Sequence, residues 1–351
     1  METSIYRIID VNFNRSREAL RMIEEFCRFS LNSKPLSSRA KQIRHQLCAA
    51  IGKLDADTLL ANRDSQTDVG RGLVIDAQHK RGDIRDCFTA ASKRLTEALR
   101  VLSEVIQTFD PNTAAAIENL RFEAYTLEKD ISLSAAAMDK YKNVRLYVLI
   151  TVKPGDTAQQ VEQLAKKCIK GGADCIQVRA KGLNDSDAIE ISKVVTAACS
   201  DSGVLSVVND RIDIAILSSA DGVHFGQGDL TVPQGRSLQI SPMVFGYSTH
   251  SIEQLNEAID SGSDYVGIGP VFPTDTKPHE KVAGLDYVKQ AAEILKETGV
   301  GHAAIGGITL ENIDQVLNAG ARTIAVCSAV TDADDPENMC KRLKRKILAF
   351  V

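Results

Sequence analysis

Side chains that could bind phosphate and a metal ion follow a series of short apolar segments in the C-terminal part of this 351-residue chain. The cations are Arg179, Lys181 and Lys277, and the carboxylates are Asp210 and Asp229. Arginine binds phosphate oxygens in pairs, and lysine binds them as a point charge. Two carboxylates can hold one Mg²⁺ whose remaining ligands are phosphate oxygens and water. These residue types predict a polycationic, metal-assisted site for a diphosphate group.

A second group of residues offers backbone N–H groups and hydroxyls instead of charge. Gly306-Gly307 and Cys327-Ser328 follow the last two apolar segments. Uncharged donors of this kind can cradle a monophosphate. Taken singly, an aspartate after a strand is more often a helix N-cap, and a Gly-Gly pair is more often a turn. Their joint position after successive apolar segments favours two separate phosphate positions in one site.

Eight apolar segments must position these side chains. They occupy residues 146–150, 175–179, 204–209, 222–226, 243–248, 265–269, 302–308 and 323–330. Segments with helical spacing alternate with them. Parallel strands need crossover helices, and eight such alternations are typical of a (β/α)8 TIM barrel, an α/β fold whose active site lies at the carboxyl ends of the strands. A doubly wound open sheet is the alternative fold.

The first part of the chain has a different, all-α pattern. Apolar residues recur there at helical spacing, and the sequence EALR occurs twice, at residues 18–21 and 97–100. We therefore expect a helical domain at residues 1–140 before a barrel at residues 141–351. Arginines on these helices could form a phosphate-binding cluster, but salt-bridged, solvated helix faces explain the same residues with fewer assumptions.

Composition excludes several other classes of protein. The net charge of -4 gives no basis for bulk binding of nucleic acid or of a membrane surface, and no apolar run reaches the length of a transmembrane helix. The eight cysteines form no CxxC pair, which is typical of reduced thiols. We expect a cytoplasmic protein whose partners are small molecules. The composition leaves homo-oligomerisation open.

The motifs at the ends of the apolar segments, taken in order, resemble those of thiamine phosphate synthase. They are IQVRAK, VNDRID, GVHFGQGDL, GYSTHS, GPVFPTDTK, AIGGI and VCSAV. The resemblance implies a transferase of thiamine biosynthesis. Its reaction would condense 4-amino-2-methyl-5-(diphosphooxymethyl)pyrimidine with a thiazole phosphate, or the carboxylated form of that thiazole, and would release pyrophosphate. The implied cofactor is Mg²⁺.

The resemblance also implies a role for each matching residue. The pyrimidine diphosphate would be held by Gln177, Val178, Arg179, Ala180, Lys181, Asn209, Ser248 and Lys277. The thiazole phosphate would be held by Thr274, Asp275, Thr276, Gly307, Cys327 and Ser328. Asp210 and Asp229 would bind Mg²⁺, and Arg179, Lys181 and Lys277 would be the catalytic cations. No protein nucleophile is needed, so we assign no catalytic role to the histidines.

Other functions stay open at this point. A thiazole tautomerase has a related barrel but a histidine where this chain has Pro270, and a barrel that only binds thiamine precursors would not need the acidic pair. The N-terminal part resembles the helical extension of some two-domain members of the synthase family, through NFNRSREALRMIEEFCRF, TDVGRG, RLTEALRVLSEV and ENLRFEAYTLEK. It is either an interaction module or an unconventional kinase for pyrimidine phosphate, since it contains no P-loop.

Overall fold

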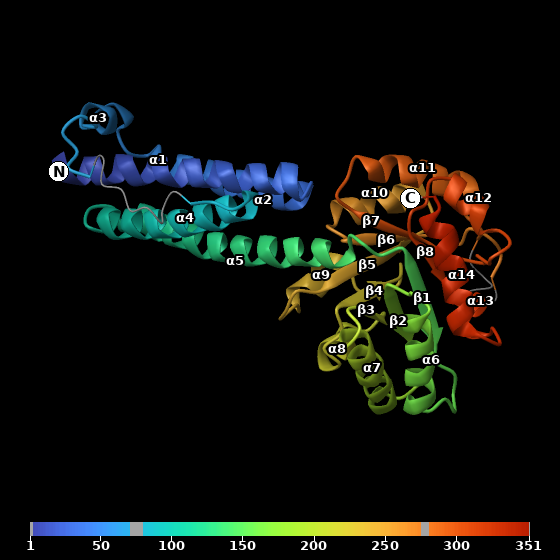
Figure 1. Cartoon of the computed structure of the whole chain (residues 1–351). Coiled ribbons are helices and arrows are strands. Elements are labelled where there is room, and N and C mark those ends of the chain that lie inside the picture. The colour runs from blue at the N-terminus through green and yellow to red at the C-terminus, as the bar shows by residue number, and fades with distance from the viewer. Residues whose placement is uncertain (1–2, 71–79, 275–280, 351) are drawn as a thin grey trace. The chain divides into compact units, whose positions relative to one another are not determined.

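The computed structural model describes residues 3–70, 80–274 and 281–350. The chain forms two compact units, Met1–Ser132 and Leu133–Val351. Figure 1 shows helices throughout the first unit and a barrel of strands surrounded by helices in the second. Within the described residues, no helix combines the length and the apolar character needed to cross a membrane.

The first unit is built from amphipathic helices, as the spacing of apolar residues predicts. They are α1 (Thr3–Glu25), a π-helical turn η1 (Phe26–Ser30), α2 (Lys34–Ile51), α3 (Ala56–Ala61), α4 (Ile84–Gln107) and α5 (Pro111–Tyr141), whose last residues belong to the second unit. Leu20, Leu47 and Leu99 are fully buried in the core of the first unit. The Ser33 and Asp83 side chains cap α2 and α4 by accepting backbone N–H groups.

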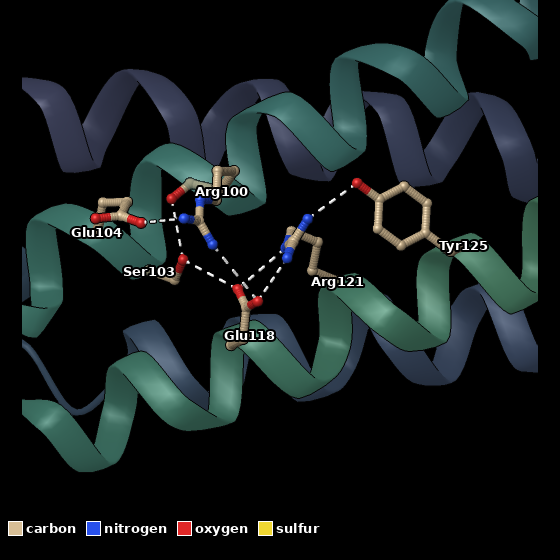
Figure 2. A network of polar contacts seen from close by, with 6 residues as sticks. All are labelled: Arg100, Ser103, Glu104, Glu118, Arg121 and Tyr125. Carbon is tan, nitrogen blue, oxygen red and sulfur yellow. Dashed lines mark hydrogen bonds and ion pairs between the residues drawn. The ribbon is translucent and has the colours of Figure 1, made fainter.

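The arginines of the two EALR segments are held in ion pairs with glutamates. Arg21 lies 2.6 Å from Glu25, and Arg100 lies 2.5 Å from Glu104. Figure 2 shows Arg100 in a wider network, in which Glu118 of α5 also accepts from Arg121. These contacts favour the interpretation of the arginines as parts of salt-bridged helix faces.

The second unit is a closed barrel of eight parallel strands in sequence order. The strands are β1 (Leu146–Thr151), β2 (Cys175–Arg179), β3 (Leu205–Asn209), β4 (Gly222–Phe225), β5 (Val244–Thr249), β6 (Tyr265–Ile268), β7 (Gly301–Ala304) and β8 (Ile324–Val326). Each coincides with one of the eight apolar segments, although β7 and β8 are shorter than the segments that predicted them. The TIM barrel prediction is confirmed, and the doubly wound sheet is excluded because β1 also pairs with β8.

Helices follow the strands and cover the outside of the barrel (Figure 1). They are α6 (Ala158–Lys170), α7 (Asp185–Ser200), α8 (Ile212–Leu217), α9 (Val232–Ser237), α10 (Ile252–Asp260), α11 (Gly284–Lys296), α12 (Ile313–Asn318), α13 (Ser328–Thr331) and α14 (Pro336–Leu348). Alternate strand residues point to opposite faces, so Val148 and Ile150 of β1 pack in the outer core, while Tyr147 and Leu149 belong to the inner core cluster. The carboxyl ends of the strands, where the candidate residues lie, form one rim.

Candidate active site

One cavity extends from the interior of the barrel to this rim. Gln177 and Arg179 of β2, Asn209 of β3 and Ser248 of β5 line it on one side. Gly307 and Ser328, which follow β7 and β8, line it on the other side. Closure of the barrel thus brings together residues that are up to 151 positions apart in the sequence (328 − 177). Arg179 is partly buried, so the effective dielectric constant around it is lower than in water and its attraction for an anion is stronger.

A chain of hydrogen bonds crosses the interior of this cavity. Gln177 Nε2 donates to the Tyr147 hydroxyl at 2.8 Å, which lies 2.8 Å from the Tyr265 hydroxyl. The Tyr265 hydroxyl lies 3.0 Å from His224 Nδ1, and His224 Nε2 lies 2.9 Å from Ser248 Oγ. Burial raises the pKa of Tyr147 and of Tyr265 well above the ordinary value, so both hydroxyls keep their protons. These hydrogen bonds connect Gln177 to Ser248, and the sequence predicts that both residues hold the pyrimidine diphosphate.

The two candidate metal ligands lie at the rim between neighbouring strands. Asp210 directly follows β3 and has a left-handed backbone (φ 63°), which aspartate tolerates better than most residues. Its backbone N–H donates to the carbonyl of His224 at 2.8 Å, and its carboxylate pairs with Lys181 Nζ at 2.8 Å. Asp229 accepts the N–H of Gly226 at 2.7 Å. Desolvation and a hydrogen bond with Asp210 raise the pKa of Asp229 above its usual value.

This donor set fits Mg²⁺ better than a metal that needs an all-protein cage. Asp210 contributes to the raised pKa of Asp229, so the two carboxylates are near neighbours and both could bind one cation. Within the described ranges, no group of three or more histidine, cysteine, aspartate or glutamate side chains converges on a metal position. Mg²⁺ commonly keeps several waters and takes few carboxylates together with substrate phosphates.

The opposite side of the cavity is built from backbone. Gly306 and Gly307 both have positive φ, 106° and 61°, and a Cβ at Gly307 would lie 2.4 Å from the carbonyl oxygen of Pro273. Phe272 N–H donates to the carbonyl of Gly306 at 3.0 Å, which ties the loop after β6 to the loop after β7. Glycine is therefore needed here for both backbone conformation and close approach.

The structure distributes the predicted residues over three groups, apart from Asp229, which lies in the turn after β4 and lines neither the central cavity nor the one next to it. Gln177, Arg179, Asn209, Ser248, Thr274, Gly307, Cys327 and Ser328 line the central cavity. A neighbouring cavity of about 310 Å³ is lined by Val178, Ala180, Lys181 and Asp210. Val178 lies there because its side chain points to the outer face of β2. Asp275, Thr276 and Lys277 lie outside the described residues.

Sequence reasoning gave no role to Tyr147, His224 and Tyr265, which line the central cavity. The tyrosines stand within otherwise aliphatic strands, and a buried hydroxyl needs a partner. The two tyrosines could therefore have indicated a buried hydrogen-bond network inside the barrel. They could not identify the partners, since His224 and Tyr265 are 41 positions apart.

Both units of the chain match known proteins. Residues 146–330 match the family model described as thiamine monophosphate synthase, and residues 7–130 match the ThiD2 family. A thiamine-phosphate synthase of Nostoc punctiforme is 37% identical over 95% of this chain and 91% of its own length. One of Thermosynechococcus vestitus is 36% identical over 97% of this chain and 94% of its own length.

The structure of a thiamine phosphate pyrophosphorylase from Pyrococcus furiosus covers 61% of this chain and 98% of its own, with 32% identity and a TM-score of 0.53. The family model covers the barrel and its rim, and the relatives extend across both units. The chain therefore belongs to the thiamine-phosphate synthase family of transferases, in a two-domain form with a ThiD2-type N-terminal region.

Proposed function

We propose that the barrel condenses 4-amino-2-methyl-5-(diphosphooxymethyl)pyrimidine with 4-methyl-5-(2-phosphooxyethyl)thiazole, or its carboxylated form, to give thiamine phosphate and pyrophosphate. One observation carries this proposal. A single cavity has a cationic and amide side, with Arg179 and Asn209, and a side formed by glycine backbone and a hydroxyl, with Gly307 and Ser328. Two sides of such different chemistry suit a diphosphate leaving group on one substrate and a monophosphate on the other.

Charge stabilisation would be the main work of the charged side. The C–O bond between the pyrimidine methylene and the diphosphate breaks, so negative charge grows on the departing diphosphate. Arg179 would bind this group bidentately, and Lys181 would move from Asp210 to a phosphate oxygen. Lys277, in the segment outside the described residues, would add a third cation. Mg²⁺, held by Asp210 and Asp229, would supply Lewis-acid stabilisation of the same charge when bound.

Positioning would be the work of the rest of the cavity. The electron-rich aminopyrimidine can carry positive charge on its methylene carbon, to which the thiazole nitrogen then forms the new C–N bond. Gln177 and Ser248 would orient the pyrimidine, while the Gly307 and Ser328 region and Thr274 would fix the thiazole phosphate. Apolar side chains such as Leu149 and Ile305 line the same cavity and would exclude water that could trap the cation.

Substitution of the acidic pair tests the assignment. We expect Asp210→Asn and Asp229→Asn each to lower kcat/KM for thiamine phosphate formation by about a hundredfold, the loss of a few kcal/mol of transition-state stabilisation. Asp213→Asn is the matched control, because Asp213 is an exposed aspartate paired with Arg211. It should retain nearly full activity. The measurement is steady-state synthesis from both purified precursors over a range of Mg²⁺ concentrations.

Two results would contradict the proposal. Equal activity of the three variants would separate the acidic pair from the reaction. Wild-type protein that binds the thiazole phosphate but yields no thiamine phosphate would instead favour a tautomerase or a precursor-binding barrel.

A further inference from the structure

The end of helix α5 closes the amino-terminal end of the barrel. Ala137, Tyr141 and Val144 belong to the same buried cluster as Tyr147 and Tyr265, and Tyr141 is only 5% exposed. The ring of Tyr141 stacks on the ring of Tyr265, with centroids 4.3 Å apart and planes at 12°. The helix thus ends in a direct contact with a residue that lines the central cavity.

Glycines on three strands make room for this stack of rings. A Cβ at Gly301 of β7 would lie 2.6 Å from the Tyr141 ring. A Cβ at Gly246 of β5 would lie 2.2 Å from the Tyr265 ring and 2.4 Å from His224 Nδ1. A Cβ at Gly267 of β6 would lie 3.3 Å from the same imidazole. The barrel wall therefore leaves the space that these aromatic rings fill.

The stack leads into the hydrogen-bond chain of the cavity. The Gln177 amide donates to Tyr147, and hydrogen bonds then join Tyr147 to Tyr265, Tyr265 to His224 Nδ1, and His224 Nε2 to Ser248 Oγ. Ser248 lines the cavity, so its hydroxyl can meet a ligand there. Rotation of the Tyr265 ring would break this order at two adjacent bonds, and Tyr141 lies against the face of that ring.

We propose that Tyr141 is a positioning residue for the pyrimidine substrate: its ring fixes the Tyr265 ring, and the hydrogen-bond chain through Tyr265 and His224 orients Ser248 and Gln177. This inference rests on the proposed function, since it takes Ser248 and Gln177 to hold the pyrimidine. The Tyr141 hydroxyl has a lesser part, because it donates at 3.3 Å to the carbonyl of His302, which is outside the hydrogen-bond chain of the cavity. The aromatic face carries the effect, and phenylalanine can supply it.

The test compares Tyr141→Leu with Tyr141→Phe in the full chain. We expect Tyr141→Leu to raise KM for the pyrimidine diphosphate about tenfold. KM for the thiazole phosphate should stay within about twofold, because the hydrogen bonds through Tyr265 lead to Gln177 and Ser248, which are proposed to hold the pyrimidine. Tyr141→Phe should restore the wild-type pyrimidine KM. Tyr125→Leu is the matched control, because Tyr125 lies on the same helix but is 42% exposed. It should change neither KM.

A second variant keeps the stack and removes only the hydroxyl. Tyr265→Phe should weaken binding of the pyrimidine diphosphate as Tyr141→Leu does, measured by calorimetry with no thiazole present. Calorimetry also separates the role of Tyr141 from the proposed function. If wild-type protein binds the pyrimidine diphosphate but forms no product, the proposed function is wrong, and the effect of Tyr141→Leu on pyrimidine binding can still be measured. Equal changes in both KM values for Tyr141→Leu, no rescue by phenylalanine, or unchanged pyrimidine binding by Tyr265→Phe would overturn the inference.

Discussion

His302 of β7 shows how its surroundings fix the protonation of a single side chain. Its Nε2 accepts the backbone N–H of Arg322 at 2.9 Å, so the imidazole is neutral with its proton on Nδ1. Burial, followed by repulsion from Arg322 and Arg145, lowers the pKa of His302 to about 4. A second proton would place two N–H donors opposite each other. The folded barrel therefore favours the neutral imidazole of His302.

This arrangement predicts a pH dependence of stability. An unfolded histidine has a pKa of about 6.5, so between pH 6.5 and pH 4 the unfolded chain binds a proton that the folded chain does not bind. The free energy of unfolding should fall by roughly 2 kcal/mol as pH is lowered through this window, after allowance for the partial exposure of the ring. Urea denaturation at several pH values should show a shallower dependence for His302→Gln than for wild type.

The control for this prediction is His45→Gln, which alters an exposed histidine of α2. It should leave the pH dependence as it is in the wild type. Identical slopes for His302→Gln and wild type would show that the neutral imidazole of His302 does not contribute.

At the scale of elements, one device recurs at the amino-terminal end of the barrel. Asp174, Asp221 and Asp264 each precede an even-numbered strand, and each carboxylate accepts the backbone N–H at the start of the preceding odd-numbered strand. Each also pairs with a cation, which is Lys344, Lys140 or Arg236 respectively. These N–H groups belong to the first or second residue of each strand, and the aspartates complete the hydrogen bonding of the barrel there.

Asp264 should matter most of the three for stability. Its side chain is 4% exposed, and it accepts from Phe245 N at 2.7 Å and from Arg236 at 2.8 Å. Asp264→Ala should lower the free energy of unfolding by about 3 kcal/mol, because it leaves the buried Phe245 N–H without its acceptor and removes the carboxylate partner of a largely buried guanidinium, which keeps the Gly262 carbonyl.

The matched control is Asp185→Ala, whose aspartate also pairs with an arginine but is 69% exposed. Its cost should stay below about 1 kcal/mol. Chemical denaturation of both variants makes the comparison, and similar losses would contradict the role given to the buried pair.

At the scale of the whole molecule, the sequence predicted more of the architecture than of the interior. The eight strands could be predicted because each is a short apolar segment followed by a helical one, a pattern local to the chain. The rim residues could be predicted because a TIM barrel places strand ends together. The hydrogen bonds that connect Gln177 to Ser248 could not be predicted, because they depend on barrel closure and on the rotation of the Tyr265 ring. The pairing of Lys181 with Asp210 depends in the same way on loop conformation.

In the proposed function, one rim of the barrel binds two phosphorylated substrates, joins them and releases pyrophosphate. The most direct test incubates the full chain with both precursors and Mg²⁺ and follows thiamine phosphate and pyrophosphate in the same reaction. We expect the two products to accumulate in equal amounts and to stop when a chelator removes the metal ion. Pyrophosphate that accumulates without thiamine phosphate would show hydrolysis in place of condensation and would contradict the proposed function.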